Sequence, residues 1–233
     1  MKLKNPVVDY RELRLRNLNT DRFRHLKMLL YWPAFGLLFL FVERFYQVDS
    51  YYPVSCYLDD LIPFCEWFLF AYLFWFVYLV GMLLYTLLYD IDAFKSMMKF
   101  IMITYTTAIV TYLLLPTCQN LRPVEFPREN AMTWFLAHFY QFDTNTNVCP
   151  SIHVMGALAV LCTAWHCKGL QRPAWKAAFA LTALLICLST VFLKQHSVVD
   201  VIMALPSCIL ADWLCFRKKQ PQKILAWDGA AKS

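Results

Sequence analysis

Long apolar runs alternate with short polar segments along the whole chain, and their lengths predict membrane-spanning helices. A helix needs about 20 mostly apolar residues to cross the hydrocarbon core of a bilayer. The runs that approach this length cover residues 27–43, 66–88, 97–115, 150–167, 176–193 and 196–216. The pattern therefore predicts an all-α, polytopic membrane protein with six transmembrane helices.

The polar segments define the rest of the predicted organisation. Residues 1–26 form a basic arm, 27–216 a single membrane domain and 217–233 a polar tail. Residues 89–96 are expected to be a turn. The longest connection, 116–149, is expected to contain a short interfacial helix near 128–141, and long irregular connections in compact domains usually serve a function.

Composition and charge agree with a membrane domain and give it an orientation. The chain is 60% hydrophobic, above the 45–50% or so of a soluble domain, and residues 1–25 are too polar to be a cleavable signal. Most Lys and Arg residues fall in residues 1–27, the tail, the 89–99 turn and the 168–176 loop. The remaining four lie in segments assigned to the outer side: Arg44, Arg122, Arg128 and Lys194.

The uneven distribution of Lys and Arg between these segments predicts that both termini are cytoplasmic. The chain's compactness, together with the resemblance described below, favours a bacterial plasma membrane. A nucleic-acid partner fits poorly, because the positive residues flank membrane spans, and the oligomeric state is left open. The nine cysteines lack the CxxC spacing of a zinc site. A Cys118–Cys149 disulfide, a Cys56–Cys65 disulfide and free thiols all stay open as alternatives.

Three polar clusters interrupt the apolar pattern at the predicted outer face. The segment 189–200 carries Ser189, Lys194, His196 and Asp200 where two apolar runs meet. If 196–200 were helical, His196 and Asp200 would share one face, because residues four apart are neighbours on a helix. Ionisable groups in such a position are costly to bury and usually functional.

The other two clusters are Pro150-Ser151-Ile152-His153, which opens the fourth run, and Arg122-Pro123 in the preceding loop. The free N–H groups of a first helical turn attract anions. A neutral histidine can act as a nucleophile and a second as an acid, while arginine clamps phosphate. These residues predict one phosphate site that requires no cofactor. A metal site made by His153, His196 and Asp200 is the weaker alternative.

Together the three clusters resemble the type 2 phosphatidic acid phosphatase superfamily, the membrane lipid phosphatases related to vanadium haloperoxidases. That family carries K-x6-R-P, then P-S-x-H, then S-R-x5-H-x3-D on a six-helix core. Arg122-Pro123 matches the end of the first motif and residues 150–153 match the second. Ser189, His196 and Asp200 match the third with its spacing intact.

The resemblance implies a metal-independent lipid phosphate phosphatase. His196 would be the nucleophile that forms a phosphohistidine, Asp200 its orienting partner and His153 the general acid. The phosphate would be bound by Arg122, Ser151 and the N–H groups near Ile152. Their positions on the same predicted face add Lys194, two residues before His196, and Ser189 as expected phosphate-binding residues. The substrate would be a lipid phosphate in the outer leaflet.

Two positions depart from the family motifs, and they keep other functions open. Leu115 stands where the first motif has lysine, and Thr190 where the third has arginine. These departures, and the segment Asp143–Asn147, resemble the branch that contains inositol-phosphorylceramide and sphingomyelin synthases, which transfer a headgroup to a lipid alcohol. A headgroup phosphotransferase is therefore the first alternative. A non-catalytic membrane protein with a degenerate site is the second.

Overall fold

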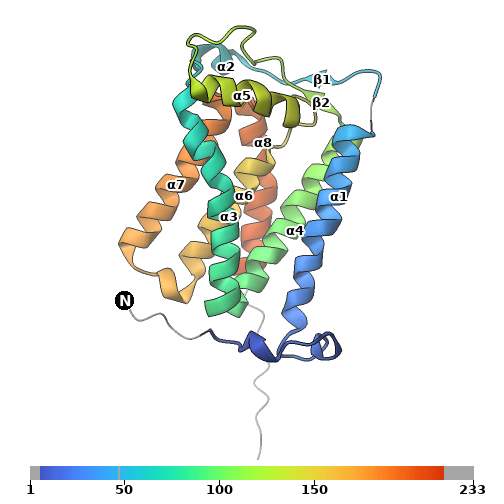
Figure 1. The fold of residues 1–233 in the computed structure, drawn as a ribbon, viewed down its shortest axis with the longest axis vertical. Coiled ribbons are helices and arrows are strands. Elements are labelled where there is room, and N and C mark those ends of the chain that lie inside the picture. The colour runs from blue at the N-terminus through green and yellow to red at the C-terminus, as the bar shows by residue number, and fades with distance from the viewer. Residues whose placement is uncertain (1–5, 47, 218–233) are drawn as a thin grey trace, which may run out of the picture.

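The computed structural model describes residues 6–46 and 48–217, which form a bundle of roughly parallel helices (Figure 1). The α-helices are α1 (Tyr31–Arg44), α2 (Tyr57–Leu61), α3 (Leu69–Tyr89), α4 (Ile91–Leu114), α5 (Ala131–Phe142), α6 (Ile152–His166), α7 (Pro173–Phe192) and α8 (Val198–Asp212). The short elements α2 and α5 gather at one end of the bundle. Residues 1–5, 47 and 218–233 lie outside the described part, so the predicted arm and tail are covered only in part.

Five helical segments are long and apolar enough to cross a membrane, which makes the chain a multi-pass membrane protein. They are Arg24–Arg44, Glu66–Tyr89, Ile91–Leu114, Pro173–Phe192 and Val198–Arg217. The predicted fourth span corresponds to α6, which has only 15 residues. At about 1.5 Å per residue it is shorter than the roughly 30 Å hydrocarbon core. A count of six spans therefore stays a prediction.

Helix α6 is short but central. It packs against α3, α4, α7 and α8, and nine of its residues are buried. Small residues such as Gly156, Ala157 and Ala159 let the neighbouring helices approach closely. Because protein surrounds α6, its length does not have to match the thickness of the lipid.

Two predicted boundaries are wrong, each for a local reason. Helix α4 begins at Ile91, so the expected turn over 89–96 is reduced to Asp90. The Asp90 carboxylate accepts the N–H of Ala93 at 3.1 Å and caps the helix. Helix α8 begins at Val198 instead of 196, because Ser197 is its N-cap. In both cases the cap fixes the helix start within a stretch whose hydropathy changes gradually.

The long connections contain two short strands that the all-α prediction omitted. Strand β1 (Tyr52–Pro53) pairs in parallel with β2 (Thr117–Cys118), and an isolated bridge joins Cys118 to Thr146. Backbone groups at the covered end of a bundle need partners, and this pairing supplies them. Helix α5 lies within the connection where a short helix was expected, and all nine cysteines are free thiols.

Gly156 allows the closest contact of α6 with its neighbours and provides a test of this packing. A Cβ at this position would lie 2.7 Å from both Trp75 Nε1 and Tyr105 Oη. We expect Gly156→Ala to destabilise the protein by about 1–3 kcal/mol through overpacking. Thermal unfolding in detergent, followed by circular dichroism, measures the change.

Gly81 is the matched control for this substitution. It also lies inside a helix, but a Cβ there meets nothing within 4 Å. Gly81→Ala should be neutral or stabilising by up to about 1 kcal/mol, because alanine favours the helical conformation. Equal melting temperatures for the two variants would contradict the central packing of α6.

Candidate active site

The turn between α7 and α8 presents His196 at the end of the bundle that carries α2 and α5. The N–H groups of Gln195 and His196 both donate to the carbonyl of Thr190 at 3.0 Å. Lys194 has a φ of 54°, in the left-handed region that non-glycine residues rarely adopt. This backbone holds the imidazole just outside the first turn of α8.

Asp200 orients His196 through a capping arrangement. Its Oδ2 accepts the N–H of Ser197 at 2.9 Å and lies 3.2 Å from His196 Nδ1. The expectation that both residues share a face of one helix is wrong, because His196 precedes the helix. The capped turn nevertheless brings the two side chains together. With Nδ1 directed at the carboxylate, Nε2 is the nitrogen left for chemistry.

Asp200 also joins two segments that are far apart in the chain. The N–H of Ser151 donates to the Asp200 carbonyl at 3.2 Å. Ser151 is the N-cap of α6, its Oγ accepting the N–H of Val154, and Tyr112 Oη donates to the carbonyl of Pro150 at 2.7 Å. The start of α6 is thus fixed relative to the start of α8.

His153 lies in the first turn of α6 and faces His196. The centroids of the two rings are 5.7 Å apart, and the ring planes are inclined by 61°. The His153 ring also contacts Tyr72 and Trp75, with centroid distances of 4.5 and 4.6 Å. Its Nδ1 is buried and has no partner within the described chain. Two imidazoles therefore lie close together, and within the described chain Nδ1 of His153 has no hydrogen-bond partner.

Both histidines line one small cavity of about 30 Å³. Most of its lining residues carry polar side chains, and they come from α1, α4, the 143–148 segment, α6 and the α7–α8 turn. The lining residues are Phe39, Glu43, Tyr112, Asp143, Thr144, Thr146, Asn147, Val148, Ile152, His153, Gln195 and His196. Of the lining residues that the structure describes, none is Lys or Arg.

Arg122 supports this wall without lining it. Its guanidinium donates to the carbonyls of Tyr140, Asp143 and Thr144 at 2.6–2.9 Å. It also donates to Gln195 Oε1 at 2.6 Å. Its Nε is buried and has no partner in the described chain. The positive charge lies directly behind Gln195.

Two other residues predicted for the site have different surroundings. Lys194 Nζ donates to the carbonyls of Asp59 and Ile62 at 2.6 Å each, and Ser189 Oγ donates to the carbonyl of Ile186 at 2.6 Å. Neither residue lines the cavity. The structure therefore brings His153, His196, Asp200, Ser151 and Ile152 together, but gives Lys194 and Ser189 backbone partners.

Asp59 of α2 stabilises the His196 turn from the other side, and the sequence patterns did not identify this role. It is buried, and its carboxylate accepts from Ser197 Oγ at 2.6 Å and from the N–H of Val198 at 2.8 Å. The N–H of Cys56 donates to it at 2.7 Å. Burial alone would raise the pKa of Asp59, but these donors outweigh burial and lower it.

Cysteine and metal chemistry gain no support from the geometry. Burial, followed by the nearby Asp200 carboxylate, raises the pKa of Cys149 to about 12, so its thiol stays protonated at neutral pH. Within residues 6–46 and 48–217, no group of three or more His, Cys, Asp and Glu side chains is arranged to hold a metal ion.

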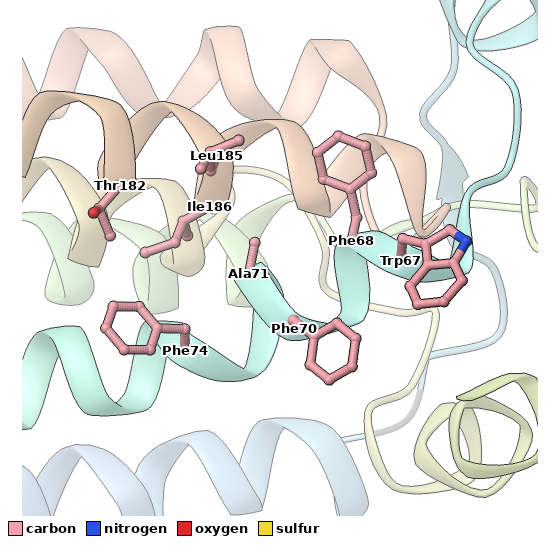
Figure 2. A pocket seen from close by; sticks show the side chains of 8 residues that line it. All are labelled: Trp67, Phe68, Phe70, Ala71, Phe74, Thr182, Leu185 and Ile186. Atoms are coloured by element: carbon pink, nitrogen blue, oxygen red, sulfur yellow. The ribbon is translucent and has the colours of Figure 1, made fainter. Parts of the chain in front are cut away.

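A larger apolar groove lies elsewhere on the bundle. Figure 2 shows Phe70 and Phe74 of α3 on one side and Leu185 of α7 on the other. The groove has a volume of about 500 Å³ and shares no residue with the histidine cavity. Its described lining residues are apolar except for Thr182, and none of them is titratable.

Comparison with known families agrees with this geometry. A family model described as PAP2 superfamily matches residues 96–224, more than half of the chain. The chain belongs to the PAP2 superfamily. No curated protein and no solved structure matches the chain. PAP2 proteins are phosphatases or phosphotransferases, and the family therefore supports an enzyme.

The PAP2 match begins after α1, so it does not include one wall of the cavity. Glu43 lies at the C-terminal end of α1 and lines the cavity with Asp143. The one signal for Glu43 in the sequence was an ionisable residue at the end of an apolar run, which is also typical of an ordinary interfacial residue. Gln195 carried no signal beyond its position next to His196.

The Asp59 contacts generate a stability prediction. Asp59→Asn keeps the shape of the side chain but removes the charge that three donors stabilise. We therefore expect the free energy of unfolding to fall by about 1–3 kcal/mol at neutral pH. Because the folded pKa is lowered, the stabilisation is present in full above the ordinary carboxylate pKa of about 3.9 and is lost as pH falls through the folded value. The difference in the free energy of unfolding between wild type and Asp59→Asn should be constant between about pH 5 and 8. It should become smaller below about pH 4.

Asp60→Asn is the control, because Asp60 is exposed on the same short helix. Denaturant titrations in detergent at several pH values measure both variants. Two results would argue against this role of Asp59. One is a difference in unfolding free energy between wild type and Asp59→Asn that stays the same down to pH 3, and the other is an equal destabilisation by Asp60→Asn.

Proposed function

We propose that the protein is a metal-independent lipid phosphate phosphatase that acts through a phosphohistidine on His196. One observation carries the proposal. The ring centroids of His153 and His196 lie 5.7 Å apart on one cavity, and Asp200 Oδ2 lies 3.2 Å from Nδ1 of His196. The membership in the PAP2 superfamily supports the same reaction class.

The first step is an in-line displacement at phosphorus. Nε2 of His196 attacks, a P–N bond forms, and the P–O bond to the lipid alcohol breaks. Asp200 stabilises the positive charge that develops on the imidazole, because its carboxylate lies 3.2 Å from Nδ1. This arrangement is that of a nucleophile with an orienting partner.

His153 supplies the proton to the departing alkoxide. Its ring packs against Tyr72 and Trp75, and these contacts fix its position opposite His196. In the second step His153 accepts a proton from water as the water attacks phosphorus. The P–N bond then breaks, and inorganic phosphate leaves.

Phosphate oxygens are bound by the first turn of α6. Ser151 caps this helix. The N–H groups of Ile152 and His153 lie in its first turn, where no carbonyl of the same helix is available as an acceptor. Arg122 adds positive charge from behind Gln195. Lys194 and Ser189 are left out of this proposal, because their polar groups bind carbonyls.

The site is proposed to face the outer side of the membrane. It lies at the end of the bundle that carries α2 and α5, while the basic segment that precedes α1 lies at the opposite end (Figure 1). Positive residues favour the cytoplasmic side. The lipid tails would then extend into the outer leaflet beside the bundle.

Headgroup transfer is the second candidate, and one observation favours it. The cavity wall carries the carboxylates of Glu43 and Asp143, and its described part includes no Lys or Arg. In this reaction a lipid alcohol replaces water in the second step. Release of inorganic phosphate from phosphatidic acid supports the phosphatase, whereas transfer to ceramide or diacylglycerol supports the transferase.

Substitution of the two histidines tests the shared mechanism. We expect His196→Ala to lower turnover by a factor on the order of 10⁴ or more, because the nucleophile is removed. His153→Ala should lower it by about 10²–10⁴, the usual contribution of a general acid. Radiolabelled substrate quenched in base should leave phosphohistidine on wild type and none on His196→Ala.

His138→Ala is the control, since His138 is exposed on α5 and does not line the cavity. Its turnover should equal that of wild type. Unchanged turnover in His196→Ala would support the alternative of a degenerate, non-catalytic site.

A further inference from the structure

The histidine cavity is too small for the phosphate group that the proposed chemistry requires. Its volume is about 30 Å³. A water molecule needs about 10–15 Å³ of such space, so there is room for about two water-sized atoms. A phosphate ester brings four oxygens around one phosphorus atom. The structure therefore describes a closed conformation, and at least one wall has to move before a substrate can reach His153 and His196.

Most walls of the cavity are held firmly by the rest of the chain. Helices α4 and α6 lie in the core of the bundle, where nine residues of α6 are buried. Lys194 and Asp59 tie the α7–α8 turn to α2. The 143–148 segment forms backbone hydrogen bonds with residues 117 and 119. Movement of any of these walls would break several buried contacts.

Helix α1 is the wall that the bundle holds least firmly. It lies at the edge of the bundle, beside α4 (Figure 1). Of the five candidate spans it is the least buried, and within α1, all of which the structure describes, Val42 alone is buried. Leu37, Leu40 and Phe41 are exposed on its outer surface. Because few of its side chains are buried, α1 can tilt without disrupting the core.

Polar bonds hold the outer end of α1 against the 143–148 segment. Thr144 Oγ1 donates to the Glu43 carboxylate, and the side chain of Asn147 is bonded to the same carboxylate. Arg44 donates to the carbonyl of Phe142 at 3.0 Å. Such bonds make a modest net contribution to stability, because water can replace them. They close one edge of the cavity, which Glu43, Thr144 and Asn147 all line.

We propose that the lipid substrate enters the cavity from the side, through a portal between the outer end of α1 and the 143–148 segment, and that the bonds of Glu43 and Arg44 close this portal. A lateral portal suits a lipid, because its acyl chains then stay in the hydrocarbon while the phosphate reaches the histidines. The inference rests on the proposed function and names the route to the same site. The PAP2 match begins at residue 96, so α1 lies outside it.

Locking the outer end of α1 tests the portal. Arg44→Cys and Phe142→Cys are combined in the full chain in detergent and treated with a short bifunctional methanethiosulfonate. Both residues are exposed, and neither lines the cavity. We expect the crosslink to lower kcat/KM for phosphatidic acid by about tenfold or more, because apparent affinity scales with the fraction of open molecules. A reductant should restore the wild-type rate.

Tyr31→Cys combined with Thr106→Cys is the matched control near the start of α1. Tyr31 Oη lies 3.0 Å from Thr106 Oγ1, so one long side chain joins this pair, as it joins Arg44 to Phe142. This crosslink ties α1 to α4 away from the portal and should leave turnover unchanged. Each pair is compared with its two single substitutions after the same treatment, because the nine native cysteines are present in every variant.

A second measurement depends neither on turnover nor on crosslinking. Diethylpyrocarbonate modifies neutral imidazole, and peptide mass spectrometry then reports how fast it reaches His196. Thr144→Val removes the hydroxyl that bonds to Glu43. It should speed the modification of His196 by about tenfold, the usual effect of a hydrogen bond to a charged group. Thr107→Val is the control and should change nothing, because Thr107 bonds to a carbonyl of its own helix and does not line the cavity.

The outcomes separate the portal from the proposed function. A loss of turnover with the outer crosslink and not with the inner one supports the portal. Equal turnover in the two crosslinked proteins, or a wild-type modification rate of His196 in Thr144→Val, overturns it. If wild type turns over no phosphatidic acid, the proposed function fails, and the modification rate alone decides the portal. Faster modification in Thr144→Val then supports it, and an unchanged rate overturns it.

Discussion

The buried carboxylate of Asp200 is the group on which the geometry of the site depends. Its side chain accepts from the backbone of the α8 cap and orients the ring of His196, while its carbonyl accepts from Ser151 at the start of α6. One residue thus joins two segments separated by more than 40 positions in the sequence. Each imidazole is consequently positioned relative to the other by backbone hydrogen bonds, which are more rigid than side-chain packing alone.

A second layer of contacts stabilises this centre from the loops. Asp59 caps the turn after His196, and Lys194 in return donates to the carbonyl of Asp59. These reciprocal bonds connect α2 to the α7–α8 turn across 135 positions. The lysine that looked like a phosphate ligand in the sequence therefore has a structural use. A cation that donates to two backbone carbonyls is poorly placed to move to a substrate.

Short-range motifs made the centre of the site predictable, whereas long-range contacts determined its walls. His153, His196 and Asp200 stood out because ionisable residues interrupt apolar runs at fixed spacing. The side-chain partners of Lys194 and Ser189 could not be read from spacing, since they depend on how a loop folds back. Glu43 and Asn147 reach the cavity only after α1 and the 143–148 segment meet at the end of the bundle. The helices were predictable from hydropathy, but their starts at Ile91 and Val198 depended on caps.

The central claim is that two distant imidazoles act on a single phosphorus atom, and a structure with bound orthovanadate tests it most directly. Vanadate adopts the geometry of a phosphoryl group in transfer. The account predicts vanadium bonded to Nε2 of His196, with an opposite oxygen within about 3 Å of a ring nitrogen of His153 and other oxygens at the first turn of α6. Vanadate bonded elsewhere, or at His196 with His153 turned away, would contradict it.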